Sequence, residues 1–272
     1  MTPVHATYNL IEDKSKGRLS RAARLVREIG PIGLLRLLRE NGVARSADFI
    51  VRNVRYIIAD RIVRRWDRKH NVDTAGSVQL DTLSIVGPNR DFGNECLCTS
   101  PKTFDYIMRS IPKSLAGYTF IDIGAGKSRT LLLASRFDFA KIVGVEFALE
   151  LVNFSKANLA RFKADWQRCT NLEIVQADAT QYAVPETPLV VFFYNPFSRN
   201  VFEVVMQNLL RSLAAKKRNC YVVYCSSCHD AIDWARPVIL SSGQFTELPT
   251  SQTPLFWDAI RTVRFSVFKA CN

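Results

Sequence analysis

Residues 120–130 read FIDIGAGKSRT and place two glycines, a lysine and a serine directly after an apolar run. A glycine lets the backbone approach a ligand closely and adopt a positive φ. In open parallel sheets, the loop after the first strand is a common place for a nucleotide-like ligand. The segment is therefore compatible with a loop for the phosphates of ATP or GTP, a loop for a dinucleotide, or a loop for another ligand.

A phosphate loop requires the spacing G-x-x-x-x-G-K-[ST], and residues 126–128 (GKS) supply only its end. The first glycine of that motif would fall on Ile121, inside the apolar run. Asp122 would also place a carboxylate near the phosphates, where like charges repel. No later apolar run ends in a clear Mg²⁺-binding aspartate, since the run at 189–195 ends in Asn195. These departures disfavour an NTPase.

The dinucleotide fingerprint G-x-G-x-x-G is matched only in part. Gly124 and Gly126 fit, but Arg129 fills the third position, where glycine normally allows close packing of helix on strand. Glu146 stands 20 residues beyond Gly126, as a ribose-binding carboxylate would. The dinucleotide interpretation stays open at this point.

The sequence from Asp122 to Gly126 (DIGAG) resembles the D-x-G-x-G loop of the class I S-adenosylmethionine-dependent methyltransferases. That family tolerates a residue other than glycine at the third position, and its cofactor carries no phosphate. The resemblance implies that Asp122 binds the ammonium side of the cofactor and that Glu146 takes both ribose hydroxyls. It also implies that Asp178 accepts from the adenine amino group and that Ala179 donates a backbone N–H to the ring. The alternative for each acid is a cap of the following helix.

Residues 194–197 (YNPF) resemble the (N/D)-P-P-(Y/F/W) stretch of methyltransferases that act on amino nitrogens. In that family the asparagine oxygen accepts a hydrogen bond from the target N–H, and the aromatic ring packs on the target. Asn195 and Phe197 match these two roles, although only one proline, Pro196, stands between them. The alternative is a turn after a strand, with Phe197 in the core.

The resemblance yields a defined set of expected site residues and no metal ligand. Lys127 and Arg129 are expected to be solvated residues of the first helical turn, with Lys127 able to touch the cofactor carboxylate. Asp73 and Thr74 are further candidates, with polar turn residues as the alternative. The residues expected to bind the cofactor or to act in the transfer are Asp122, Gly124, Ala125, Gly126, Glu146, Phe147, Asp178, Ala179, Thr99, Asn195, Pro196 and Phe197.

Short apolar runs alternate with amphipathic segments from residue 118 onward, which predicts an α/β fold with a mostly parallel sheet covered by helices on both faces. The methyltransferase resemblance covers residues 100–272 and implies seven strands in the order 3-2-1-4-5-7-6, with an antiparallel edge. The expected strands are TFIDI, KIVGVE, LEIVQAD, PLVVFFYN, CYVVYCS, FTELP and IRTVRFSVFKA. The expected helices are PKTFDYIMRSI, SRTLLLASRF, LELVNFSKANLARFKADW, RNVFEVVMQNLLRSLAA and a short one around His229–Arg236.

The chain divides by composition into four parts. Residues 1–17 are expected to be a mobile arm, 18–69 a basic helical region, 70–100 a loop-rich connector covering the site, and 101–272 the Rossmann-like methyltransferase domain. The charge is uneven: residues 1–70 hold 16 Lys+Arg against 7 Asp+Glu, whereas the remainder holds 21 against 18. The positive field therefore belongs to the N-terminal quarter.

The basic helices admit three uses. They can bind an acidic protein or RNA, lie on an anionic membrane surface, or pack on the domain with their arginines in solvent. No run approaches the roughly 20 apolar residues of a membrane span, and no secretory signal opens the chain, so a cytoplasmic protein is expected. The seven cysteines suggest no disulfide framework, and the C-x-x-C-H string at 225–229 is interpreted as a chance match.

The sequence thus predicts an enzyme that transfers the methyl group of S-adenosylmethionine. Its favoured acceptor is an amino nitrogen, possibly a protein lysine, because the order of motifs and the helical extension are similar to the lysine methyltransferases of the class. Small uncharacterised bacterial members of the class are also similar, including at residues 66–76. The alternatives are an RNA or small-molecule methyltransferase and a cofactor-binding scaffold without turnover that acts through the basic helices.

Overall fold

The computed structural model describes residues 60–76, 78, 83–84, 89, 92–93, 98–111, 114–226, 229–250 and 263–271. The expected arm at 1–17 and residues 18–59 of the expected basic helices lie outside these ranges. Residues 60–70 form the described part of one helix.

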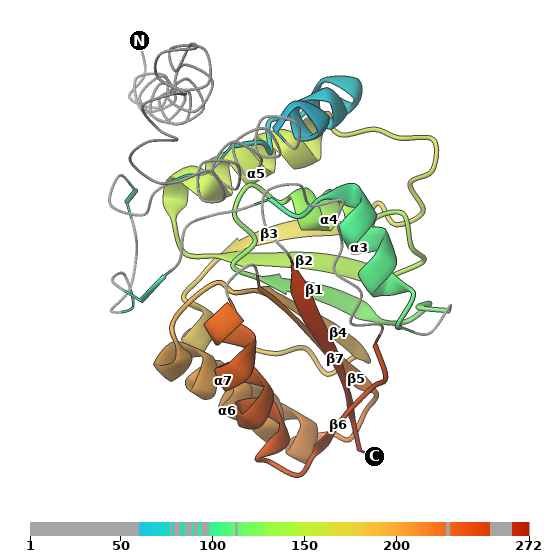
Figure 1. Ribbon diagram of the computed structural model, residues 1–272. Coiled ribbons are helices and arrows are strands. Elements are labelled where there is room, and N and C mark those ends of the chain that lie inside the picture. Colours follow the sequence, from blue (N-terminus) through green and yellow to red (C-terminus); the bar gives the residue numbers. More distant parts are fainter. Residues whose placement is uncertain are drawn as a thin grey trace, which may run out of the picture.

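A seven-stranded sheet forms the centre of the fold, in the order β3-β2-β1-β4-β5-β7-β6 (Figure 1). Strands β1 to β5 run parallel, and β7 runs antiparallel to both β5 and β6. This confirms the expected sheet and its antiparallel edge. The strands are β1 (Thr119–Ile123), β2 (Lys141–Glu146), β3 (Leu172–Gln176), β4 (Leu189–Tyr194), β5 (Cys220–Ser226), β6 (Phe245–Glu247) and β7 (Arg264–Ala270).

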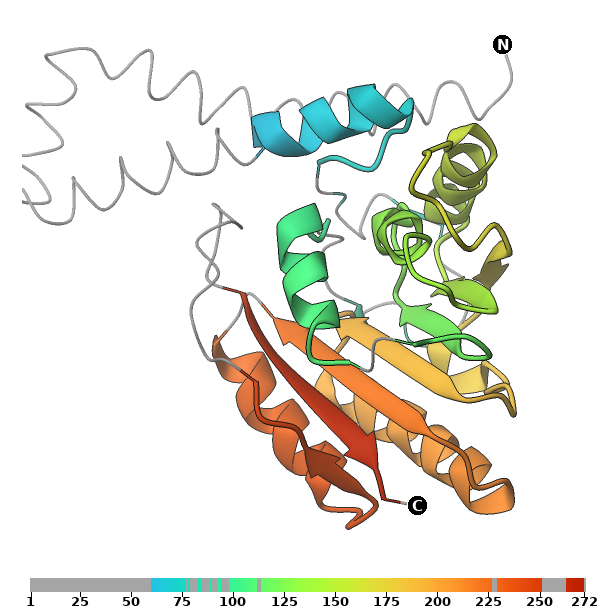
Figure 2. The same ribbon diagram turned by 90° about the vertical axis from the view of Figure 1, so that its right-hand side faces the viewer.

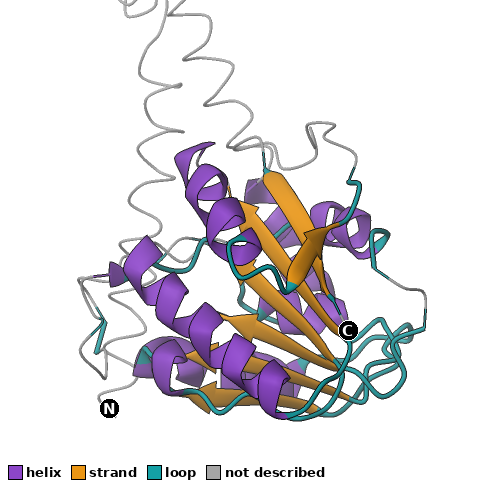
Figure 3. Ribbon diagram, turned by 90° about the horizontal axis from the view of Figure 1, so that it is seen from below, coloured by secondary structure: helices purple, strands orange, loops and turns teal. Residues whose placement is uncertain are grey.

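Helices cover both faces of the sheet (Figures 1 and 2). One layer holds α3 (Pro101–Met108), α4 (Arg129–Ala134) and α5 (Leu149–Arg161), with the helix of residues 60–70 lying outside them. The other layer holds α6 (Arg199–Ala215) and α7 (His229–Leu240). Figure 3 shows the strands fanning between the two layers with the twist that is usual for such sheets.

Burial explains why these strands form where they do. All residues of β1 and β5 are buried, and five of the six residues of β4 are buried, so these strands are continuous apolar runs. The edge strand β3 is half exposed and correspondingly more polar. Two apolar clusters, one on each face of the sheet, form the core.

Several helix ends differ from the expectation. Helix α5 stops at Arg161, before the expected end at Trp166, because the backbone of Phe162 is extended and its side chain is buried. Helix α7 continues past Arg236 to Leu240 with Pro237 inside it, since Ala235 and Ile239 are fully buried and hold both of its turns on the core.

Gly144 in β2 brings the loop after β1 close to the sheet. A Cβ atom at this position would lie 2.8 Å from the Cβ of Ala125 and 2.9 Å from Cδ2 of Leu131. The close approach of helix to strand, which a dinucleotide loop obtains from its third glycine, is thus supplied here by a glycine in the neighbouring strand. Arg129 can therefore occupy the loop position.

Candidate functional site

A pocket lies at the carboxyl ends of β1, β2 and β4. This is the edge where open α/β sheets bind ligands. The described residues of the connector contribute Thr74, Asn89, Gly93, Cys98 and Thr99 to its wall. Of the residues expected to bind the cofactor or to act in the transfer, all except Asn195 line the pocket; of the two further candidates, Thr74 lines it and Asp73 does not.

The glycine loop after β1 takes a shape that requires its glycines. Gly124 has a φ of +80°, and Gly126 has a φ of +55°. A Cβ atom on Gly124 would lie only 2.5 Å from the Cβ of Pro196. Gly124 therefore serves to let the loop after β1 contact the loop after β4 directly, and these two loops form adjoining walls of the pocket.

Glu146, at the end of β2, is buried and joins the glycine loop to the start of α5. Its Oε2 atom accepts from the N–H of Gly126 at 2.9 Å, and Oε1 accepts from the N–H groups of Phe147 and Ala148, each at 3.0 Å. Burial raises the pKa of this carboxyl, and the three amide donors partly oppose that rise. Glu146 lines the pocket and also ties the glycine loop to the two residues that precede α5.

Asp122, the penultimate residue of β1, is buried and lines the pocket. Burial raises the pKa of Asp122 to about 8, although a hydrogen bond with the Thr130 side chain lowers it and the nearby Glu146 carboxyl raises it further. In the protein without a ligand, this carboxyl is mostly protonated near neutral pH. A cationic group placed beside it would favour its ionised form.

Asp178 follows β3 and accepts hydrogen bonds both from a neighbouring residue and from the connector. Its Oδ1 atom accepts from the N–H and the hydroxyl of Thr180, which caps the short 3-10 helix η3 (Ala179–Gln181). Its Oδ2 atom accepts from Nδ2 of Asn89 in the connector, at 2.8 Å. Asp178 and Ala179 both line the pocket, where an adenine ring is expected.

The loop after β4 places Pro196 and Phe197 at the pocket wall and turns the side chain of Asn195 toward β5. Asn195 has a φ of +42°, and its Oδ1 atom accepts from the hydroxyl of Tyr224 at 3.1 Å. Phe197 is buried and forms an isolated β-bridge with Gly93 of the connector. The connector is thus fixed to the end of the pocket where methyl transfer is expected.

Lys127 and Arg129 are not the solvated residues that the sequence suggested. Lys127 is 7% exposed and Arg129 is 2% exposed, and both line the pocket. The Nζ atom of Lys127 donates to Oδ1 of Asp73 at 3.2 Å and to the carbonyl of Ala75 at 3.1 Å. The Nη2 atom of Arg129 donates to Oδ1 of Asp67 at 2.6 Å. Each of these buried cations is therefore paired with a carboxylate from residues 67–73.

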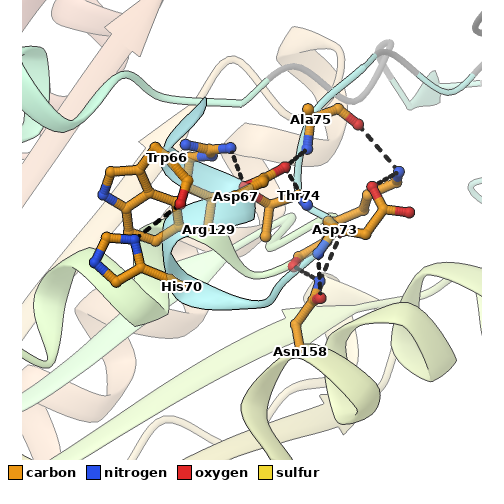
Figure 4. Close-up of polar contacts among 9 residues, drawn as sticks. Trp66, Asp67, His70, Asp73, Thr74, Ala75, Arg129 and Asn158 are labelled. Atoms are coloured by element: carbon orange, nitrogen blue, oxygen red, sulfur yellow. Dashed lines mark hydrogen bonds and ion pairs between the residues drawn. The ribbon is translucent and has the colours of Figure 1, made fainter. Parts of the chain in front are cut away.

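Asp67 holds the pocket residue Arg129 in place and was missed by sequence reasoning. Its Oδ1 atom also accepts from the hydroxyl of Thr74, and its Oδ2 atom accepts from the N–H groups of Thr74 and Ala75 (Figure 4). The ring of Trp66 lies 4.6 Å from the guanidinium carbon of Arg129. The only signal in the sequence was the polar segment 66–76, which does not reveal which distant cation it pairs with.

Asn158 of α5 holds the same segment against the glycine loop and was also missed. Its Oδ1 atom accepts from the N–H of Asp73, and its Nδ2 donates to the carbonyls of Asp73 and Lys127 (Figure 4). The hydroxyl of Ser155, one turn earlier, donates to the carbonyl of Gly126 at 2.8 Å. Residues 66–75, which we name the strap, are thus bound to the glycine loop and α5 by buried polar contacts.

Two features, a metal-binding cluster and a membrane-spanning helix, are absent from the described residues. No group of three or more histidine, cysteine and acidic side chains in the described ranges could hold a metal ion. None of the described helices is long and apolar enough to cross a membrane.

No protein-family model and no curated protein matches the sequence. Solved structures that the chain resembles include precorrin-6Y C5,15-methyltransferase from Geobacter metallireducens GS-15, with a TM-score of 0.48 and 17% identity over 69% of this chain and 100% of that chain. The glycopeptide N-methyltransferase MtfA gives a TM-score of 0.48 and 11% identity over 64% and 96%. An RNA methyltransferase from Salinibacter ruber in complex with S-adenosyl-L-homocysteine gives 0.42 and 17% over 64% and 92%. Because these TM-scores lie below 0.5, we infer the function from the residues of the site.

Proposed function

We propose that this protein is an S-adenosylmethionine-dependent methyltransferase. The observation that carries the proposal is the convergence of three acids on one pocket at the carboxyl edge of a sheet with the order 3-2-1-4-5-7-6. Asp122 lies near the end of β1, Glu146 ends β2 and Asp178 follows β3, which are three neighbouring strands, and all three acids line this pocket. Each acid stands where the methyltransferase resemblance expects it.

The charges of the pocket favour a ligand without phosphate. Lys127 and Arg129 are cations of its wall, and each forms an ion pair with a carboxylate of the strap, so the wall carries little net positive charge to offset a phosphate. A phosphate placed beside Asp122 or Glu146 would oppose the ionisation of these carboxyls and would repel either one once it is ionised, in a buried setting where repulsion is poorly screened. ATP and NAD are therefore poor candidates, whereas a nucleoside with an ammonium group suits the same acids.

Bound S-adenosylmethionine would supply a methyl group attached to a positively charged sulfur. An acceptor lone pair would bond to the methyl carbon while the carbon–sulfur bond breaks, so that the sulfur leaves as a neutral thioether. The chain's own contribution is to position the two reactants. Glu146 suits the ribose hydroxyls and Asp178 the adenine, while the loop carrying Pro196 and Phe197 limits the acceptor's approach. The strap and the bridge between Gly93 and Phe197 reduce access of water to the pocket.

For the acceptor we favour an amino nitrogen, with protein lysine as one possibility. The YNPF stretch supports this, because Asn195 takes the position of the asparagine in the (N/D)-P-P-(Y/F/W) motif and its side-chain oxygen acts as a hydrogen-bond acceptor, here toward the Tyr224 hydroxyl. Asn195→Ala should lower turnover strongly and leave the affinity for S-adenosylmethionine unchanged. Tyr224→Phe is the matched variant, since it removes the competing hydroxyl donor and should preserve turnover. Equal turnover of Asn195→Ala and the wild type would exclude the amine site.

An RNA acceptor is the second candidate, and a basic groove favours it. The groove adjoins α3 and α4 and is lined by three arginines, one aspartate and two aromatic rings. Only Arg136 is paired, with Asp105 at 2.9 Å; neither Arg109 nor Arg168 has an ion-pair partner among the described residues. Unpaired arginines beside aromatic rings suit phosphates and stacked bases. If RNA binds there, Arg109→Ala/Arg168→Ala should weaken binding and flatten its salt dependence, unlike the equally charged control Arg211→Ala/Lys217→Ala.

Calorimetric titration with S-adenosylmethionine, NAD and ATP–Mg²⁺ tests the proposal. We expect saturable binding of S-adenosylmethionine alone, weakened in Glu146→Gln. Glutamine keeps an oxygen acceptor for the amides of the loop, so it perturbs the fold less than alanine would. Binding of NAD or ATP instead would refute the assignment. Binding without turnover on any amine, RNA or small-molecule acceptor would favour the scaffold alternative.

A further inference from the structure

Arg129 combines deep burial with an incomplete set of partners. Its side chain is 2% exposed, and its Nη2 atom donates to Asp67. Among the described residues, neither its Nε nor its Nη1 atom has a hydrogen-bond partner. A buried donor without a partner is costly, and it usually marks a role that the unliganded chain does not show. Arg129 is also one of the residues that line the pocket.

Lys127, the other cation of the pocket wall, already has partners for its ammonium group. Its ammonium group donates to Asp73 and to the carbonyl of Ala75, and it lies 4.7 Å from the centre of the Phe154 ring. These contacts occupy the directions in which an ammonium group donates. A ligand anion is therefore better served by Arg129, which still has free N–H groups.

Thr130, which follows Arg129 in α4, contacts a buried carboxyl group. Thr130 hydrogen-bonds to the carboxyl of Asp122, and both side chains line the pocket. Two adjacent residues of α4 thus differ in what they present: Arg129 carries unpartnered cationic N–H groups, and Thr130 contacts the buried carboxyl of Asp122. A ligand group with a carboxylate and an ammonium on one carbon, which is an α-amino acid, matches this pair of poles.

We propose that Arg129, oriented by Asp67 of the N-terminal helix, binds the carboxylate of the α-amino-acid group of the ligand. The inference rests on the proposed function, because S-adenosylmethionine and S-adenosylhomocysteine carry this group. The subsite is built by two distant parts of the chain, the glycine loop and the strap. The N-terminal helix is therefore part of the ligand site.

Asp67 acts as a positioning residue in this arrangement. Its two oxygens accept four hydrogen bonds, from Arg129, from the Thr74 hydroxyl and from the N–H groups of Thr74 and Ala75. The ring of Trp66 lies against the other side of the guanidinium group (Figure 4). These contacts fix the plane of Arg129 before a ligand arrives, so less conformational entropy is lost on binding.

Titration of the full chain with S-adenosylhomocysteine and with 5′-methylthioadenosine tests the inference, because the second compound lacks only the amino-acid end. Arg129→Gln should weaken S-adenosylhomocysteine by about tenfold to a hundredfold, the usual size of a charge-assisted hydrogen bond, and leave 5′-methylthioadenosine unchanged. Asp67→Asn should lower the ratio of the two affinities by a smaller factor. Arg129→Lys should restore part of the ratio. Arg136→Gln, just beyond the other end of α4 and outside the pocket, is the matched control and should leave both affinities unchanged.

Each result of this titration decides between outcomes. Equal losses for both compounds in Arg129→Gln, or no loss for either, would overturn the inference while leaving the proposed function intact. Failure of the wild type to bind either compound would refute the proposed function. If Arg129→Gln does not fold because Asp67 is left unpaired in the core, the double variant Asp67→Asn/Arg129→Gln removes both charges, and the same ratio of affinities applies.

Discussion

The buried carboxyl of Asp122 should make ligand binding depend on pH. Its pKa is raised to about 8 by burial, so the free protein holds a proton there at neutral pH. A ligand ammonium group favours the ionised form and therefore requires loss of that proton. At about pH 6 roughly 1% of the free protein has Asp122 ionised, against about half at pH 8. The affinity for S-adenosylhomocysteine should thus rise about fifty-fold over this range, or about 2.3 kcal/mol.

Calorimetry at several pH values and in two buffers of different ionisation enthalpy measures this linkage. Below pH 8 we expect close to one proton released for each S-adenosylhomocysteine bound. Asp122→Asn should bind with little dependence on pH, because it has no proton to lose. 5′-Methylthioadenosine, which lacks the ammonium group, should show no slope with either protein. A flat profile in the wild type, or an unchanged slope in Asp122→Asn, would refute the reasoning.

Three further predictions concern stability. Gly124→Ala should lower the free energy of unfolding by about 1–3 kcal/mol in urea titrations, since its Cβ would meet Pro196 at a positive φ; an unchanged midpoint would contradict the close approach of the two loops. Arg218→Met should lower the free energy of unfolding by about 3–5 kcal/mol, because the carbonyls of residues 185, 187, 212 and 216 would lose a donor, at about 1–3 kcal/mol for each buried group left unsatisfied; it should leave ligand affinity unchanged in the protein that remains folded. The folded state keeps the Asp122 proton up to about pH 8, whereas the unfolded chain loses it near 3.8, so this group makes stability fall as pH rises between those values. Asp122→Asn should remove that fall, and a parallel pH profile of the two proteins would contradict it.

The fold could be predicted because each central strand leaves a continuous apolar run. Strands β1 to β6 all begin within one residue of the expected positions. A parallel strand is buried on both faces, so its composition does not depend on a particular distant partner. The antiparallel edge of β5, β7 and β6 followed from the family resemblance and is confirmed.

The surroundings of the glycine loop could not be predicted in the same way. Arg129 and Asp67 are 62 positions apart, and the charge of each is as common on a solvated helix as in a buried pair. The sequence places Asn195 after β4 but does not reveal its bond from Tyr224, 29 positions away in β5. Local patterns report which face of an element is buried, whereas long-range polar pairs depend on how the elements are stacked.

A crystal structure of the full chain with S-adenosylhomocysteine tests the central claim most directly. The account predicts the ligand at the glycine loop, with its ribose hydroxyls on Glu146, its adenine beside Asp178 and Ala179, and its carboxylate on Arg129. The sulfur should face the loop of Pro196 and Phe197. A ligand bound outside this pocket, or bound with its ribose away from Glu146, would contradict the account.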